Sequence, residues 1–437
     1  MIHYKRLISA AIFLALTSLA VAQTNTNSPY TRYGFGQLAD QNFGNSKAMG
    51  GIAYGLRNGY QINASNPASY TAIDSLTFLF DAGVTLQNAN FKDGATQTNA
   101  RNSSFDYLAM QFRLWKKMGM TVGFLPFSSV GYNISKTHEF ADASKGSWAE
   151  TYTGDGGFHQ IFAGLGYKIF DNLSIGANFS YLYGDITHQT VTAISSADTR
   201  SVKKEEFSIS DVKLDFGLQY TYKLNKKNVF HVGAVYSLGH TLNGDAYKNH
   251  QTGFESNGNI YVQTETGDTL SNPFKLPHTF GAGLTYVYDN RLTVGLDYTL
   301  QQWEDCELDW NKFEKESLQM SSRSKIALGA EFLPNPISRN YLNRIRYRVG
   351  AYYATPYTKV SYKDPASGQI GTFDGAREYG VSLGFGLPMF QSKSILNISG
   401  QYIKVSPKFK GLMEENYLCV NIGLTFNERW FMKWKVE

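Results

Sequence analysis

The sequence predicts an all-β fold, namely a 14-stranded antiparallel transmembrane β-barrel with an N-terminal plug, or hatch, in its lumen. Three observations lead to this prediction. Apolar and polar residues alternate along many segments of the chain, and the connections between these segments are alternately very short and long. Aromatic residues make up 15% of the chain, yet no apolar run after the N-terminus is long enough for a membrane helix. A barrel explains this combination, because only alternate residues of each strand face lipid.

The chain begins with a pattern that is typical of an export signal. Lys5 and Arg6 precede an apolar run over residues 7–19, and three small residues follow. A basic start, an apolar centre and a small-residue cleavage site indicate a secretory signal peptide over residues 1–22. Loss of Lys5 and Arg6 lowers the basic count from 41 to 39, against 36 acidic residues. This balance argues against a nucleic-acid partner.

The stretch of residues 43–70 lies just ahead of the first predicted strand. It is rich in Gly, Asn, Ser and Ala, contains Gly50-Gly51, and closes with Asn66-Pro67-Ala68. The stretch is too apolar for a solvated linker and too interrupted for a long helix. We interpret it as a compact plug inside the barrel. The polar lead before it is expected at the periplasmic mouth, and the lead and plug together form a unit over residues 23–75.

The alternating segments predict the barrel over residues 76–427, with a periplasmic interfacial tail at 428–437. The expected strands are residues 76–89, 103–115, 119–133, 158–170, 173–189, 206–224, 228–240, 276–288, 291–303, 321–333, 344–355, 376–390, 394–404 and 417–427. The stretches expected as long external loops are residues 90–102, 134–157, 190–205, 241–275, 304–320, 356–374 and 405–416. Short turns on one side and long loops on the other are typical of outer-membrane barrels, and the even strand number places both chain ends on the periplasmic side.

The two faces of the predicted strands differ in character. In the segment 291–303, Leu292, Val294 and Leu296 alternate with Thr293, Gly295 and Asp297. A charge on the lipid face costs about 2 kcal/mol or more at the midplane, so we expect Asp297 to point inward. Pairs of glycines separated by one residue, as in segments 164–166, 281–283 and 384–386, are interpreted as small lumen-facing positions that make room for the plug.

Catalysis finds little support in the sequence. Zincin, α/β-hydrolase and phosphate-binding motifs are absent, and the 8 His and 2 Cys show no metal-ligand spacing. We therefore expect neither an enzyme, a metal site nor a cofactor. Cys306 falls in a predicted loop and Cys419 in the last strand. A bridge between them is one alternative, and two unrelated thiols are favoured because their strands are far apart in order.

The third predicted strand contains the segment Gly123 to Gly131, with Pro126 and Phe127 at its centre. Proline donates no ladder hydrogen bond, and a closed barrel has no free edge for it, so Pro126 should cause a bulge or kink. One interpretation is a lateral opening through which apolar cargo leaves the lumen. The other is a bulge that only eases the curvature of the wall.

Arg344, Arg346 and Arg348 alternate with apolar residues at the start of another predicted strand. This spacing predicts three guanidinium groups on the lumen face near the periplasmic end. Ion pairs with plug carboxylates such as Asp40 or Asp74 are the favoured interpretation, and attraction of an anionic head group is the alternative.

The chain resembles the FadL/TodX/OMPP1 family of outer-membrane channels for hydrophobic compounds. The resemblance rests on the segment Ala48 to Gly51, on Asn66-Pro67-Ala68 about fifteen residues later, on the count of fourteen strands and on the irregular third strand. It implies that Gly50, Gly51, Asn66, Pro67 and Ala68 belong to a hatch. It also implies that the segment around Pro126, with Gly123, Phe127 and Gly131, forms a lateral gate.

The resemblance further implies a monomeric channel in the bacterial outer membrane that passes apolar or amphipathic small molecules, such as long-chain fatty acids, without energy coupling. Tyr- and Phe-bearing loops at 241–275 and 356–374 are the candidate entry sites for cargo. Relatives similar to PorV imply an alternative: a barrel that transports nothing and serves as a scaffold or subunit of an outer-membrane export or assembly complex, with protein partners.

Overall fold

The computed structural model describes residues 26–94, 96–140, 146–194, 199–256, 259–306, 319–363, 370–389, 393–407 and 412–429. The signal peptide predicted over residues 1–22 and most of the tail predicted over 428–437 therefore lie outside the described residues. In the described part of the chain, no helix is long and apolar enough to cross a bilayer.

The wall is a closed antiparallel β-barrel of fourteen strands, as the sequence predicted. The first strand, β2, pairs with the last, β20, and this pairing closes the ring. Three of the fourteen positions consist of two successive elements, namely β4 with β5, β9 with β10, and β11 with β12. The strands are β2 (Thr77–Asp93), β3 (Thr96–Trp115), β4 (Met118–Pro126), β5 (Ser128–Glu139), β6 (Ser147–Lys168), β7 (Leu173–Ile194), β8 (Thr199–Lys223), β9 (Asn228–Ser237), β10 (Gly244–Ser256), β11 (Asn259–Ser271), β12 (Thr279–Tyr288), β13 (Leu292–Gln301), β14 (Arg323–Phe332), β15 (Arg346–Ala354), β18 (Arg377–Pro388), β19 (Ile395–Ser406) and β20 (Glu414–Arg429).

Large apolar side chains form a belt on the outer face of this wall, because every second residue of each strand points outward. Phe179 on β7, Leu296 on β13 and Leu418 on β20 are each at least half exposed, while the intervening Asn178, Asp297 and Cys419 are buried on the inner side. Asp297 therefore points inward, as predicted. The belt supplies the apolar surface that a hydrocarbon environment requires.

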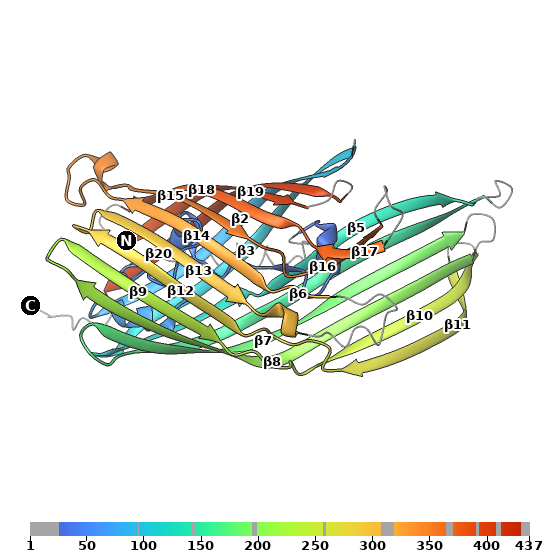
Figure 1. The fold of residues 1–437 in the computed structure, drawn as a ribbon, viewed down its shortest axis with the longest axis horizontal. Coiled ribbons are helices and arrows are strands. Elements are labelled where there is room, and N and C mark those ends of the chain that lie inside the picture. Colours follow the sequence, from blue (N-terminus) through green and yellow to red (C-terminus); the bar gives the residue numbers. More distant parts are fainter. Residues whose placement is uncertain are drawn as a thin grey trace, which may run out of the picture.

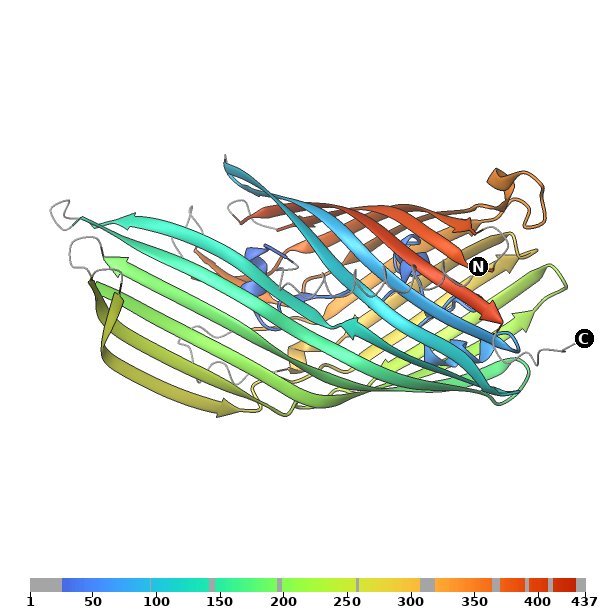
Figure 2. The same ribbon diagram turned by 180° about the vertical axis from the view of Figure 1, so that it is seen from behind.

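The N-terminal segment lies inside the ring of strands, as the blue ribbon in Figures 1 and 2 shows. It contains the 3-10 helix η1 (Pro29–Arg32), the short strand β1 (Gln37–Leu38), the helix α2 (Gly44–Lys47) and the 3-10 helix η2 (Pro67–Ala72). The strands of the barrel are joined by long connections at one end, the long-loop end, and by short turns at the other, the short-turn end. The N-terminal segment runs from the long-loop end, where Tyr30 donates to the carbonyl of Met413, to the short-turn end, where Asp74 lies 3.8 Å from Lys393.

The expected position of the lead at the periplasmic mouth, which is the short-turn end, is wrong for its described part. Residues 26–40 lie at the opposite end, because the apolar side chains of this segment pack against the long-loop half of the wall. Residues 1–25 fall outside the described part of the chain, so the predicted periplasmic N-terminus stays a prediction.

One side of the barrel projects far beyond the other, which the sequence did not indicate (Figure 1). Strands β6, β7 and β8 have 22, 22 and 25 residues, whereas β12, β13 and β14 have 10 each. A membrane-spanning strand needs about 9–11 residues. The long strands therefore extend roughly 40 Å further along their own direction, at about 3.3 Å per residue.

This projection corrects several loop predictions. The stretches 90–102, 134–157, 190–205 and 241–275 were expected as loops and are largely strands, and 356–374 contains a separate hairpin of β16 (Lys359–Lys363) and β17 (Ile370–Asp374). Polar residues stand on both faces of the projecting strands, so the apolar alternation that marks a lipid-facing strand is missing there.

Candidate functional site

The third wall strand is broken in two at the place where the sequence predicted a kink. β4 ends at Pro126 and β5 begins at Ser128, with Phe127 between them. The ladder between β3 and β4 stops at the pair Leu108 and Phe124. Beyond that pair, no strand pairing between β3 and β5 is present in the described part of the chain, although β5 continues to pair with β6. The wall therefore has a seam between β3 and β5.

The seam has a cause on each side. The carbonyl of Pro126 points toward the seam, where it accepts a hydrogen bond from Gln41 of the lead. In a strand, the N–H and the carbonyl of one residue point to the same edge, so an N–H at position 126 would also point toward β3. Proline lacks this donor, so β4 cannot extend its ladder with β3. On β3, the register with β2 shifts between Gly83 and Val84, so that Asp106 bulges out of the ladder at the same level.

The N-terminal lead occupies this seam and takes up the backbone groups that the break leaves. The Gln41 side chain donates to the carbonyl of Pro126 at 2.9 Å, and the Ala39 N–H donates to the carbonyl of Phe127 at 2.9 Å. β1 then pairs with the first two residues of β5. The hydroxyl of Thr31 contacts both the N–H and the carbonyl of Gly131, at 3.3 and 3.4 Å.

Phe35 in the lead fills an apolar cluster next to the seam. Its ring lies 4.7 Å from that of Phe274, 5.3 Å from that of Trp303 and 5.8 Å from that of Phe127. Gly36, the next residue, has a φ of +77°, and a Cβ there would lie 2.5 Å from the carbonyl oxygen of Ser129. Glycine therefore permits the turn that presents the phenyl ring. The apolar site beside the break is occupied by the chain's own side chain.

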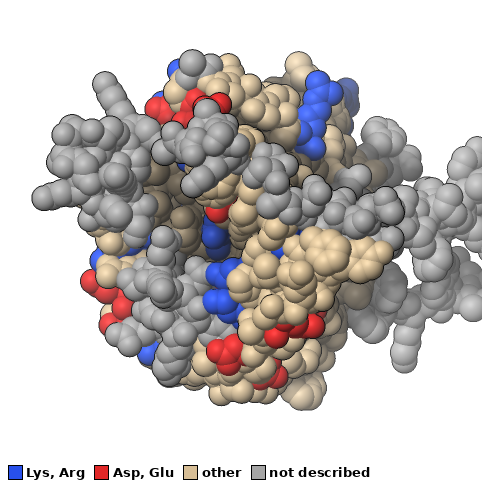
Figure 3. Space-filling model, turned by 90° about the vertical axis from the view of Figure 1, so that its right-hand side faces the viewer, with Lys and Arg blue, Asp and Glu red and all other residues tan. Residues whose placement is uncertain are grey.

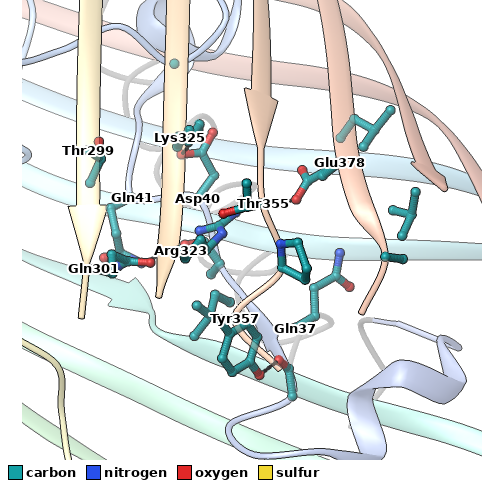
Figure 4. A pocket seen from close by; sticks show the side chains of 18 of the residues that line it. Gln37, Asp40, Gln41, Thr299, Gln301, Arg323, Lys325, Thr355, Tyr357 and Glu378 are labelled. Atoms are coloured by element: carbon teal, nitrogen blue, oxygen red, sulfur yellow. Dashed lines mark hydrogen bonds and ion pairs between the residues drawn. The ribbon is translucent and has the colours of Figure 1, made fainter. Parts of the chain in front are cut away.

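A cavity of about 290 Å³, lined by both polar and apolar side chains, lies between the lead and the opposite wall. Figure 4 shows Arg323 and Lys325 of β14, Glu378 of β18 and Asp40 of the lead around it. Asp40 lies 3.7 Å from Lys325, and Arg323 lies 3.4 Å from Glu378. Viewed from the long-loop end, the molecule is hollowed at its centre and basic side chains are visible inside (Figure 3). This cavity thus carries charges of both signs beside apolar side chains such as Leu38 and Trp303.

The stretch 43–70 is held by buried polar side chains of the inner wall. One oxygen of Asp297 accepts hydrogen bonds from the N–H groups of Ala53 and Tyr54, at 2.6 and 2.8 Å. Gln219 donates to the carbonyl of Tyr54 at 2.9 Å, and Ser382 accepts from the N–H of Gly50 at 3.0 Å. This segment has few backbone hydrogen bonds of its own, so the wall supplies the partners that buried peptide groups require.

The predicted hatch residues all lie in this segment. Asn66 accepts a hydrogen bond from the N–H of Ala68 and caps η2, with Pro67 at the first helical position. Gly50 and Gly51 have φ values of +68° and +86°. The paired glycines of the wall make room for the segment, as predicted, since Gly166, Gly283 and Gly384 face Tyr70, Tyr54 and Ala48.

The arginine ladder is only partly as predicted. Arg346 and Arg348 point inward, and each lies 2.7 Å from a carboxylate oxygen of Glu331 on the neighbouring strand. Arg346 also donates to the hydroxyl of Tyr60 in the plug at 2.9 Å. Arg344 belongs to the 3-10 helix η6 (Tyr341–Arg344) outside the strand, and its guanidinium lies over the ring of Tyr341.

The expected ion pairs with Asp40 and Asp74 are wrong, because these carboxylates lie near Lys325 and Lys393 instead. The two cysteines are free and buried. Cys306 lies in the cluster around Phe35, where burial raises the pKa of its thiol to about 11. Cys419 packs in a different cluster with Tyr417, so the two thiols are structurally unrelated.

Sequence reasoning missed the residues that connect the plug to the seam. Lys47 in α2 lies 2.8 Å from the carboxylate of Asp106, the bulged residue of β3, and Thr31 and Gln41 bind the broken strand. The sequence did carry a signal for the turn at Phe35, because the flanking Gly34 and Gly36 indicate a turn. Nothing local in the sequence marks Lys47, Thr31 or Gln41.

A family model described as BamG matches residues 1–437. The chain belongs to the BamG family. Comparison with curated proteins gives no sequence match.

Three solved structures illustrate the fold of this chain. The CymD monoaromatic hydrocarbon channel has a TM-score of 0.58 at 14% identity, with 92% of this chain and 100% of that chain covered. The toluene transporter TodX of P. putida has a TM-score of 0.58 at 14% identity, with 90% and 100% covered. A FadL homologue of Pseudomonas aeruginosa has a TM-score of 0.59 at 11% identity, with 88% and 98% covered. The BamG-family chain therefore has the FadL-type barrel fold.

Proposed function

We propose that this BamG-family barrel is an outer-membrane channel for passive uptake of hydrophobic or amphipathic small molecules, such as long-chain fatty acids. The long-loop end faces the outside of the cell and the short-turn end faces the periplasm. Cargo enters the hollow at the long-loop end and leaves sideways through the seam between β3 and β5. The observation that carries the proposal is the break of the third strand between Pro126 and Ser128, which interrupts the wall beside an apolar cluster.

The driving force in this proposal is desolvation. An apolar molecule gains about 25 cal/mol for each Å² of apolar surface removed from water, and the cluster around Phe158, Phe274 and Trp303 offers such a surface. Because Phe35 fills this cluster, cargo has to displace it. The lead that carries Phe35 also covers the seam, so entry of cargo and opening of the lateral exit are the same movement.

The similarity to hydrocarbon and fatty-acid channels supports the proposal at the level of the fold. The plug gates the barrel by holding the lead in place, through Lys47 at Asp106 and through Asp297 at Tyr54. Neither a cofactor nor a catalytic step takes part, and the barrel acts as a monomer.

A reversible covalent lock tests the proposal. Leu38 and Ser128 are direct partners in the pairing of β1 with β5, so a Leu38→Cys/Ser128→Cys variant places two thiols within disulfide distance. Oxidation should fix the lead on the seam and slow uptake of a fluorescent fatty acid into proteoliposomes at least tenfold, and a reductant should restore it. Equal uptake before and after reduction would contradict the lateral exit.

The control for this experiment is a disulfide in the continuous part of the wall. Val294 and Ala330 are direct partners in the ladder between β13 and β14, far from the seam. A Val294→Cys/Ala330→Cys variant adds the same chemistry without holding the lead, so its uptake should not change on oxidation or reduction.

The alternative function is a barrel that serves as a scaffold or subunit of an outer-membrane export or assembly complex. Two observations favour it: Phe35 already fills the apolar cluster, and the strands β6 to β8 project far beyond the length that a membrane requires. Isolation of the protein with stoichiometric partners, together with unchanged fatty-acid uptake by a deletion strain, would decide for the scaffold.

A further inference from the structure

The hairpin of β10 and β11 extends the projecting side of the wall beyond β9. β10 pairs with β8 from Gly244 to Phe254, and β11 pairs with β10 on one of its two edges. In the described part of the chain, β11 pairs with β10 alone, and β12 pairs with β9 and β13, so the other edge of β11 has no strand partner. β11 is the outermost strand of the projecting sheet in Figure 1.

This free edge lacks the features that normally protect an edge strand. Native proteins cover such edges, shorten them, or place lysine or proline in them. β11 has 13 residues and contains neither lysine nor proline, while Ile260, Val262 and three threonines give it strong strand propensity. The side chains from Tyr261 to Thr269 are all exposed.

The same barrel shows how one of its edges is satisfied. The edge of β5 at the seam binds the chain's own β1 by strand pairing at Gln37 and Leu38. An extended segment laid along an edge is therefore an interaction that this fold already uses.

We propose that the free edge of β11 is a docking site for an extended segment of a different protein on the long-loop side of the membrane, bound by addition of a strand. Backbone hydrogen bonds supply the affinity in this mode, and alternate side chains supply the specificity. The charged residues of β11 are Glu265 and Asp268, so the strand that fits carries basic or uncharged side chains. Hydrogen bonds from Gln251 and Asn249 lower the pKa of Glu265, which keeps its charge.

A second copy of this chain does not fit the edge. Two copies in one membrane share the same orientation, so a twofold axis between them runs along the membrane normal. Barrel strands tilt about 35–45° from the barrel axis. Such an axis would bring two β11 edges together at about twice this tilt, roughly 80°, which is too large for strand pairing.

Amide hydrogen exchange tests the proposal without knowledge of the partner. The protein is compared in native outer-membrane vesicles and after purification in detergent. We expect about half of the β11 amides, those on the free edge, to exchange at least tenfold more slowly in the vesicles. Strand β9 is the control, because it pairs with β8 and β12 on its two edges and should not differ. Equal exchange of β11 in both samples would overturn the proposal.

Adjacent proline variants identify the interaction as strand pairing. Consecutive N–H groups of a strand point to opposite edges, so one of Glu265→Pro and Thr266→Pro removes only a donor on the free edge. A photo-crosslinker at the exposed Thr269 should capture one different protein in cells. Amide hydrogen exchange of the hairpin shows which of the two proline variants keeps its pairing with β10. We expect capture to fall at least fivefold in that variant. Capture of a second copy, or capture unchanged in both proline variants, would contradict the proposal.

Discussion

Buried polar residues on the inner wall of this barrel act as hydrogen-bond partners for an irregular segment. Asn178, Gln219, Asp297 and Ser382 each bind backbone groups between residues 48 and 64. A buried peptide group without a partner costs about as much as a lost hydrogen bond. The polar inner face therefore fixes the plug in one position, in addition to whatever role it has for solutes.

Asp297 is the residue at which this principle is best tested. Replacement of Asp297 by alanine leaves the N–H groups of Ala53 and Tyr54 without their acceptor. Hydrogen bonds to a charged group contribute about 1.5–3 kcal/mol each, so the plug should loosen by about 3 kcal/mol or more. We expect more frequent and larger opening events of Asp297→Ala in planar-bilayer conductance recordings.

The matched control is Asp215→Ala. Asp215 also faces the lumen, but it pairs with Lys213 and Ser237 of the wall. Its loss should leave the conductance close to that of the unmodified protein. Both variants should retain the gel shift on heating that a folded barrel gives. An Asp297→Ala trace without added openings would show that the plug does not depend on this carboxylate.

At the scale of elements, the broken third strand and the N-terminal lead form one unit. Neither is regular alone: β5 lacks a neighbour at the seam, and β1 has only two residues. Each completes the hydrogen bonding of the other at Phe127, Ser128 and Ser129. Displacement of the lead therefore uncovers the seam.

A change at Pro126 tests whether the break depends on the missing donor. Pro126→Val supplies an N–H that points toward β3, where it can extend the ladder beyond Leu108 and Phe124. We expect uptake of a fluorescent fatty acid to slow severalfold, as measured in proteoliposomes. Pro388→Val is the control, because Pro388 ends β18 within a continuous part of the wall. Undiminished uptake by a folded Pro126→Val variant would refute the gate.

At the scale of the whole molecule, the barrel is complete at its short-turn half and open at its long-loop half. Strands β12 to β15 end where the apolar belt ends, whereas β6 to β8 continue into a sheet that carries polar residues on both faces. The ring of strands at the short-turn half does not depend on this extension, because β9 pairs with both β8 and β12 there and closes the ring without the β10–β11 hairpin.

Removal of the extension is therefore expected to leave the barrel intact. A variant in which residues 245–271 are replaced by a short glycine-serine turn should fold, with an unchanged heat-dependent gel shift. Capture of a partner on the long-loop side should be lost. Misfolding of this variant would show that the hairpin contributes to assembly of the ring.

The sequence by itself determined the barrel, its fourteen strands, the inward position of Asp297, the placement of residues 43–70 in the lumen and the break at Pro126. These features follow from local rules, because the side-chain period of a strand is two and proline lacks a donor wherever it stands. The tertiary structure alone decided that Arg346 and Arg348 share Glu331, that Phe35 fills the apolar cluster and that the lead covers the seam. It also decided that the stretches 134–157 and 241–275 are strands over most of their described residues, since outside the hydrocarbon both faces meet water and no alternation is required. Each of these contacts joins segments far apart in the chain, and their pairing depends on where the closed ring places them.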